Sequence, residues 1–324
     1  MGKRRELDKL LKDSEDASLD VMQSNLSYMA DSLINKVMAK ERGLTSSTQL
    51  DAVKGLTASG IDSYKRELLD VLTVISYESL RMAKKEVPKA RYKLSEIDWN
   101  KIQFVESDKV KKLKGRAVKN KKVETMWKKL PPKVRRRLKI QQELLIKTQL
   151  SDLEKAIYFT YTGRIEQNAA LAVVRADMEE YALDFINGPS VRAGAPLTAH
   201  QAIGETRSAF FEDKEVKEEI EAFEFVNNYP VNRTPICEEL NGTIFSPNDP
   251  NRFKFTPPLH WNCRSVIIPI LIGDLKGRKV KKLGIKKSNE KYLQFSEKIN
   301  KFSKEYSDAH NYESKTWEYS NYNS

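Results

Sequence analysis

Two cysteines and one histidine lie in a single stretch late in the chain. Cys237 and Cys263 are the only cysteines among the 324 residues, and His260 precedes Cys263 by three positions. Thiols and imidazoles are the ligands of structural zinc sites, which normally close with four ligands. The residues therefore indicate an incomplete metal site of three ligands, with zinc as the candidate ion, and we favour the metal-free state.

Two alternatives for these side chains stay open. We expect no secretory signal at the N-terminus, and two cysteines in such a chain favour a reducing compartment with free or metal-bound thiols. A disulfide between Cys237 and Cys263 is the less favoured arrangement. Without metal, His260 would brace the corner at Pro257 and Pro258 by hydrogen bonding to backbone.

The surrounding stretch predicts a small β-meander. The pair Asn241-Gly242 and residues 247–250 are turn signals that separate short apolar runs. Gly242 is expected to have a positive φ, because Asn-Gly hairpin turns require it. Pro257 cannot donate to a strand ladder, so the chain must leave the sheet there. The runs expected to form strands are residues 223–226, 243–245, 253–255 and 265–270.

The first part of the chain predicts two paired helices. Apolar residues recur at spacings of three and four through the first forty residues, and again from Ile61 to Ile75. The second helix must end before Pro88, because a proline disfavours helical backbone at the preceding residue. Two such helices are expected to pack as an antiparallel hairpin.

A longer helical pattern follows. The same period from Leu138 to Phe185 predicts one very long helix, or two with a break near Gly163. Residues 190–196 are then expected to form a polar loop. A shorter helix capped by Thr198 would follow it, with His200 in the first turn as a solvated or capping residue.

These elements predict an α+β fold. It is predominantly α-helical, with long helices and a helical hairpin, and carries a small C-terminal antiparallel β-meander. We divide the chain into an N-terminal helical region (1–99), a basic arm with the start of the long helix (100–149), helices with the β-meander (150–270) and a basic, polar tail (271–324). No stretch approaches the ~20 apolar residues of a membrane span.

Positive charge is concentrated in one block. Residues 101–150 hold 17 Lys and Arg against 4 Asp and Glu, a net charge of +13, while the whole chain is +12. Its natural partners are nucleic-acid phosphates or an acidic protein surface. Aromatic residues are sparse there, so any DNA binding should be independent of sequence. The candidate contacts are Lys111, Lys112, Lys114, Arg116, Lys119, Lys121, Lys122, Arg135, Arg136, Arg137 and Lys139.

One stretch resembles a known family, the phage head-morphogenesis or minor head proteins that include the Mu F-like proteins. The resemblance rests on Arg233-Thr234, Cys237-x-x-Leu240-x-Gly242 and Pro257-Pro258-x-His260-x-x-Cys263-Arg264, followed by an apolar strand that ends at Pro269. Asn232 and Thr234 stand where many relatives have an Asp and some have a Cys. The metal-ligand set is therefore incomplete relative to those members.

The resemblance implies a minor capsid protein of a tailed bacteriophage, with residues 150–270 as its head-morphogenesis domain. Such a protein is made in the host cytoplasm and packaged inside the virion near the portal. Its partners would be the portal protein, other capsid proteins and the packaged double-stranded DNA, with no membrane. It would assist head assembly, DNA packaging or ejection.

Two other functions stay open. One is a sequence-independent DNA-binding protein with a structural Cys/His knuckle. The less favoured one is a metal-dependent nuclease, because His260 is the only histidine in the region and a Cys-His-Cys set is typical of structural and not of hydrolytic zinc. The chain also carries no Walker loop, nucleophile elbow, HExxH pair or Rossmann fingerprint. We expect no catalytic residues.

Overall fold

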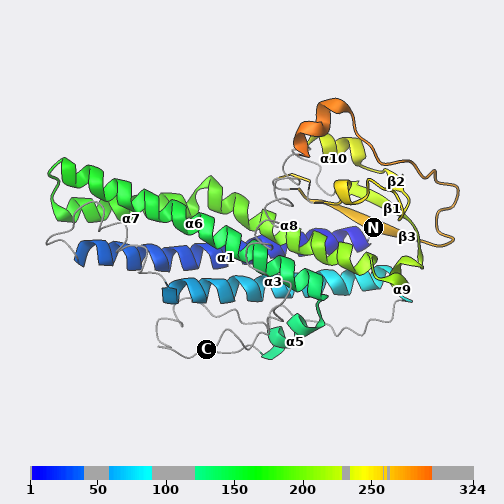
Figure 1. Cartoon of the computed structure of the whole chain (residues 1–324), viewed down its shortest axis with the longest axis horizontal. Coiled ribbons are helices and arrows are strands. Elements are labelled where there is room, and N and C mark those ends of the chain that lie inside the picture. Colours follow the sequence, from blue (N-terminus) through cyan, green and yellow to red (C-terminus); the bar gives the residue numbers. More distant parts are fainter. Residues whose placement is uncertain are drawn as a thin grey trace.

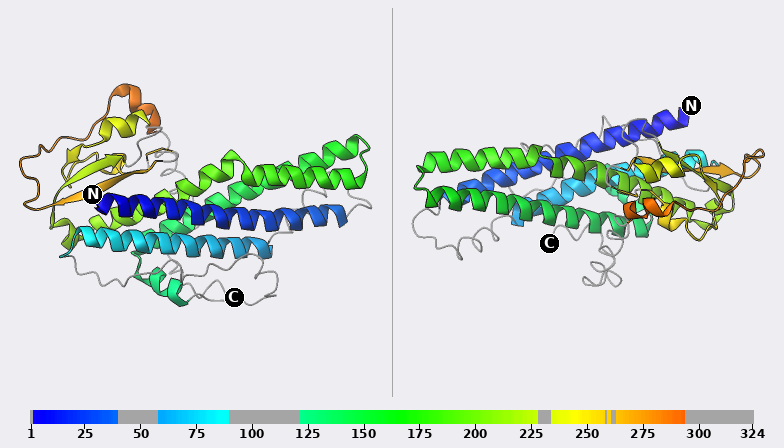
Figure 2. Two further views of the ribbon diagram at one scale, coloured as in Figure 1. Left: turned by 180° about the vertical axis from the view of Figure 1, so that it is seen from behind. Right: turned by 90° about the horizontal axis from the view of Figure 1, so that it is seen from above.

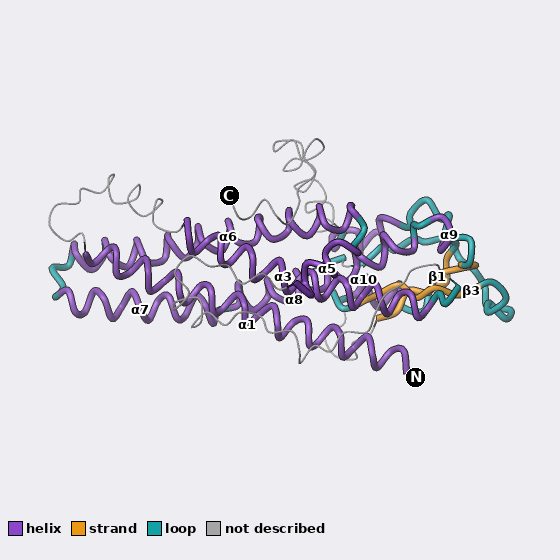
Figure 3. Tube along the Cα trace, turned by 90° about the horizontal axis from the view of Figure 1, so that it is seen from below, coloured by secondary structure: helices purple, strands orange, loops and turns teal. Residues whose placement is uncertain are grey.

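A computed structural model describes residues 2–39, 58–89, 121–227, 234–257, 259–260 and 263–293. The described chain forms an elongated helical bundle with a small β unit at one end, as Figures 1 and 2 show. The sheet is confined to that end (Figure 3). The prediction of a mainly helical α+β fold with a small antiparallel sheet is confirmed.

The predicted N-terminal hairpin is present. Helix α1 (Gly2–Ala39) and helix α3 (Ala58–Glu86) pack side by side in opposite directions. Their apolar stripes are buried against each other, since Leu26 and Leu33 of α1 and Leu68 and Ile75 of α3 are at most 2% exposed. Helix α3 ends two residues before Pro88, as the proline requires. Among the described residues, no helix has the length and apolarity needed to cross a bilayer.

The long helical pattern forms two helices with a break close to the predicted one. Short helix α5 (Lys121–Lys129) buries Trp127 before the Pro131-Pro132 break, and α6 (Pro132–Glu166) begins with Pro132 in its first turn. Helix α7 (Leu171–Asn187) then runs back along α6. Residue 150, which separates the start of the long helix from the region 150–270 in our division of the chain, lies inside α6. Most buried apolar side chains of the bundle and the β unit form one continuous core, and Ala222, Ile244 and Ile270 of the sheet form a small separate cluster.

The expected loop at residues 190–196 is wrong. Helix α8 (Pro189–Phe211) begins at once after α7 and contains Pro196 in its interior. Gly194 lets α8 approach α6 closely, because a Cβ there would lie 3.3 Å from the side chain of Leu145. Burial of this segment outweighs the weak helix propensity of Gly194 and the hydrogen bond lost at Pro196. Thr198 is consequently a buried mid-helix residue, whose hydroxyl donates to the Gly194 carbonyl, and not a cap.

The sheet is antiparallel, but its strands do not follow one another as in a meander. The order is β2 (Ile244–Phe245), β1 (Ile220–Asn227), β3 (Ser265–Leu271), so β1 is central. Helix α9 (Lys214–Lys217) precedes β1, and helix α10 (Pro235–Leu240) lies between β1 and β2. The run at 253–255 is a 3₁₀ helix, η2 (Phe253–Phe255), and not a strand.

The last element of the described chain is a second 3₁₀ helix, η3 (Lys287–Tyr292). The part of the predicted basic arm that covers residues 100–120 lies outside the described residues, and residues 121 and 122 begin α5.

Three arginines join the β unit to the helices. Arg207 of α8 donates to both carboxylate oxygens of Glu86 at the end of α3 (3.0 and 2.6 Å) and to the carbonyl of Ile267 in β3 (2.9 Å). Buried Arg252 pairs with Glu212, just after α8, at 2.6 Å. The third arginine, Arg264, lies next to the cysteine site.

Gly242 has φ +75°, as predicted, but in a different turn. Asn241, at φ −59° and ψ 129°, and Gly242 form a type II turn at the end of α10, closed by the Thr243 N–H and the Leu240 carbonyl at 2.9 Å. The Gly242 N–H donates to the Phe225 carbonyl, so this turn also docks on β1. A glycine is needed because other residues rarely adopt this φ.

We expect Gly242→Val to lower the free energy of unfolding by more than ~1 kcal/mol, because the new side chain strains the backbone although no atom crowds it. The measurement is urea unfolding. Gly163→Ala is the control, since this glycine lies inside α6 with open space at its Cβ and should be neutral or stabilising by up to ~1 kcal/mol. Equal midpoints for Gly242→Val and the parent would contradict the strained turn.

Candidate metal centre

Helix α10 presents the first thiol. Pro235 occupies its first turn, where a missing N–H costs nothing, and Thr234 is the N-terminal flanking residue. Ile236 and Leu240 are buried in the core, which fixes the rotation of this short helix. Cys237 is 3% exposed and points toward the segment that leads into β3.

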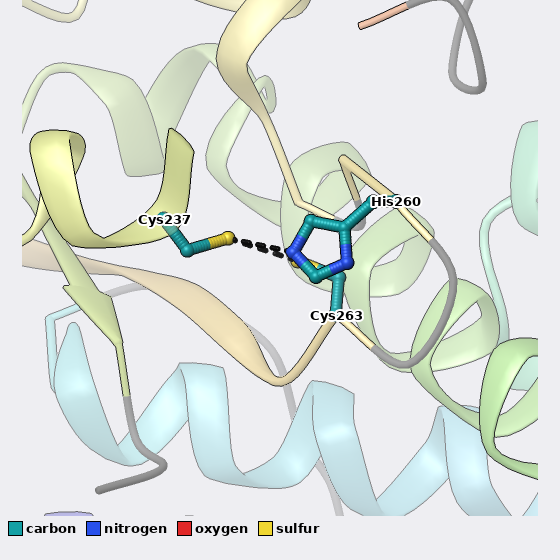
Figure 4. A group of neighbouring side chains, drawn as sticks. All are labelled: Cys237, His260 and Cys263. Atoms are coloured by element: carbon teal, nitrogen blue, oxygen red, sulfur yellow. Dashed lines mark hydrogen bonds between the residues drawn. The ribbon is translucent and has the colours of Figure 1, made fainter. Parts of the chain in front are cut away.

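A tight turn before β3 presents the other two side chains. The Cys263 N–H donates to the His260 carbonyl at 3.1 Å, and Leu259 anchors the turn in the core. The His260 Nε2 lies 3.0 Å from the Cys237 Sγ, and the two Sγ atoms are 3.7 Å apart (Figure 4). The predicted convergence of Cys237, His260 and Cys263 is confirmed.

The two thiols are free, and their pKa values shift in opposite directions. A separation of 3.7 Å is far beyond a disulfide bond, so the disulfide alternative is wrong for this state. The hydrogen bond to Cys263, together with burial, raises the pKa of Cys237. Burial would also raise the pKa of Cys263, but hydrogen bonds from Cys237 and His260 outweigh it and hold that pKa well below its usual value. Cys263 is therefore the thiol that ionises first.

This cluster could hold a metal ion. The donor atoms of the three side chains lie within 4.8 Å of one another, and they form the one such group among the described residues. The other ring nitrogen of His260, Nδ1, lies 3.4 Å from the Thr234 hydroxyl. That contact turns Nε2 toward the sulfurs, which is how a ligating imidazole is usually held.

A charged network joins the site to the bundle. Arg264, directly after Cys263, donates to Glu15 of α1 at 2.6 Å. The other carboxylate oxygen of Glu15 lies 2.7 Å from the Nε2 of His200 on α8. His200 is 3% exposed, so the expectation of a solvated or capping histidine is wrong. Sequence reasoning missed Glu15 because no local pattern marks a partner 249 positions away from Arg264.

Only part of the basic block lies among the described residues. Lys111, Lys112, Lys114, Arg116 and Lys119 lie outside the described residues, as does the side chain of Lys121, whereas Lys122 is exposed on α5.

The described arginines of this block lie on α6. Arg135, Arg136 and Arg137 are half-buried, and Arg137 pairs with Glu205 of α8 at 3.8 Å. Lys139 is only 4% exposed, with its amine 5.6 Å from the Trp127 ring, and burial lowers its pKa to about 8. Lys139 is therefore part of the core and not of an open phosphate-binding surface.

No model of a known protein family matches this chain, and no curated protein or solved structure is significantly similar to it.

The Glu15 network generates a prediction on stability. Burial would raise the pKa of Glu15, but the hydrogen bond and charge of His200, followed by those of Arg264, outweigh it and lower that pKa below 4.5. The network therefore stabilises the fold above about pH 4.5, and its contribution is lost as pH falls through the lowered pKa.

We expect Glu15→Gln to cost about 1.5–3 kcal/mol near pH 7, because hydrogen bonds to charged groups are weakened. The difference from the parent should shrink as pH falls below 4.5, and urea unfolding at several pH values measures it. Asp16→Asn is the control, because it removes the same charge from an exposed neighbouring residue. A loss that is equal for both variants, or independent of pH, would contradict the role of Glu15.

Proposed function

We propose that this chain is a minor head protein of a tailed bacteriophage, packaged in the procapsid near the portal. The supporting observation is that the residues carrying the resemblance come together as one unit. Cys237, His260 and Cys263 meet side by side, Gly242 forms the turn that docks on β1, and Arg264 ties the unit to α1. Cys237 lies on α10, whereas His260 and Cys263 lie on the turn before β3, so their convergence gives the motif a physical basis.

Each of these residues has a structural role. Leu240 is buried under the turn, and Cys237 and Cys263 are at most 3% exposed, so the motif builds a knuckle that faces inward. The knuckle lies at one end of a long bundle, as Figure 1 shows. A rigid rod with a compact head suits a protein that bridges components of an assembly. The portal and the capsid lining are the components that the resemblance implies.

We infer that the knuckle binds a structural zinc ion. Two thiolates at about 2.3 Å on a tetrahedral ion lie about 3.8 Å apart, and the observed Sγ···Sγ distance is 3.7 Å. The His260 Nε2 is closer to Cys237 than such an ion requires, so a small rotation of the ring would accompany binding. Two thiolates and one imidazole are a ligand set typical of structural zinc sites, which disfavours the nuclease alternative. A bound ion would clamp α10 to the turn before β3.

Protein purified with zinc should contain about one zinc per chain by elemental analysis. Cys237→Ser and Cys263→Ser should each lose it, and a chelator should lower the melting temperature of the parent but not of these variants, because ligand binding to the folded state adds stability. His260→Gln should lose the zinc as well, whereas His200→Gln should keep it, since His200 pairs with Glu15 and not with the cysteines. A metal-free parent with an unchanged melting temperature in chelator would contradict the zinc site.

The head-protein role is tested by co-expression with the portal and major capsid proteins encoded in the same genome. We expect the chain to co-purify with assembled procapsids at low copy number and to remain soluble alone. Particles should be compared before and after genome release. Exclusion from particles would contradict the proposal, and plasmid cleavage with added divalent metal, lost in Cys263→Ser, would favour the nuclease alternative instead.

A further inference from the structure

A basic segment crosses the outer side of the β unit. Residues 276–287, here called the basic strap, contain seven Lys or Arg and no Asp or Glu. The strap follows β3 and passes round the β unit at the end of the molecule opposite the turn that joins α6 and α7 (Figure 1). All seven basic side chains are exposed. This surface is distinct from the basic block at 101–150.

Specific hydrogen bonds fix the backbone of the strap. The Lys281 N–H donates to the Ile244 carbonyl at 2.7 Å, and the Leu283 N–H donates to the Asp249 carboxylate at 2.9 Å. The Lys286 N–H donates to Glu239 at 2.9 Å. Leu283 is 2% exposed and anchors the middle of the strap in the core. The lysines therefore project from a backbone that hydrogen bonds already hold in position, which lowers the conformational entropy lost when they bind a partner.

The nearby acids do not neutralise these lysines. Asp249 and Glu239 accept hydrogen bonds from strap backbone, while Arg278 takes up Glu224 at 2.9 Å. Within the described part of the chain, no carboxylate lies within ion-pair distance of the other six basic side chains: Lys276, Lys279, Lys281, Lys282, Lys286 and Lys287. Six like charges on a fixed segment repel one another, and a polyanion would relieve that repulsion.

We propose that the basic strap binds the phosphate backbone of duplex DNA. Lysine ammonium groups act as point charges on phosphates and read no sequence. The strap itself carries no aromatic residue on which single-stranded bases could stack. This inference rests on the proposed head-protein function, because the packaged genome is the duplex that such a protein meets.

The test is binding of the full-length chain to a fluorescent duplex of random sequence at salt concentrations between 50 and 200 mM. The variant is Lys279→Gln, Lys282→Gln, Lys287→Gln. Losing three phosphate contacts should reduce the salt slope by about 2.7, so affinity should fall about 40-fold less than in the parent over this range. Replacing the same three residues with Arg should retain the parental slope.

The matched control replaces three exposed lysines of α1 and α6, Lys9, Lys12 and Lys147, with Gln. It removes the same charge and should keep the parental slope. Equal slopes for the strap variant and the parent, equal losses for the strap variant and the control, or no duplex binding by the parent at 50 mM salt would each overturn the proposal. A strap-dependent slope in a chain that fails to enter procapsids would uphold the strap and contradict the head-protein role alone.

Discussion

The arrangement of this protein depends on three buried or half-buried arginines that tie the β unit to three different parts of the helical bundle. Arg207 reaches Glu86 of α3, Arg252 reaches Glu212 beyond α8, and Arg264 reaches Glu15 of α1. Removing a charge from water is costly, and only a close partner with further hydrogen bonds offsets that cost. A displaced β unit would leave each charge without its partner, so the ion pairs favour one docking position over others that would bury similar apolar area.

This constraint also orders the cysteine site. Cys263 is held between the His260 turn on one side and Arg264 on the other, so the link from Arg264 to α1 bears directly on where its thiol lies. Helix α10 reaches the same point from the opposite side of the knuckle through the buried side chains of Ile236 and Leu240. The site therefore lies where the bundle and the β unit are fastened together. A metal ion there would reinforce a junction that the ion pairs already define.

Charge serves two different purposes on the two sides of this molecule. At the junction, Arg207 and Arg252 are fully buried, paired and stacked on the rings of Phe211 and Phe223. On the strap, the acids support the backbone and leave the lysines exposed to solvent. Salt screens exposed charges far more than buried ones. The fold should therefore tolerate ionic strengths that weaken the binding of a partner to the strap.

Much of the fold followed from local pattern. The stripes through Leu26 and Leu68 specified α1 and α3, because a 3.6-residue period places such residues on one helix face. Pro88 required α3 to end before it, and the pair Asn241-Gly242 specified a positive φ. These features depend on residues close together in the chain, so they can be read without knowing the fold.

Long-range contacts decided the rest. The stretch around Pro196 is helical because Gly194 and its neighbours pack against α6, which no local propensity indicates. His200 became buried because Glu15, distant in sequence, supplies its partner. The types and spacing of Cys237, His260 and Cys263 determined that a ligand set could exist. Only the tertiary structure decided that α10 and the turn before β3 bring those atoms together, because core packing sets their separation.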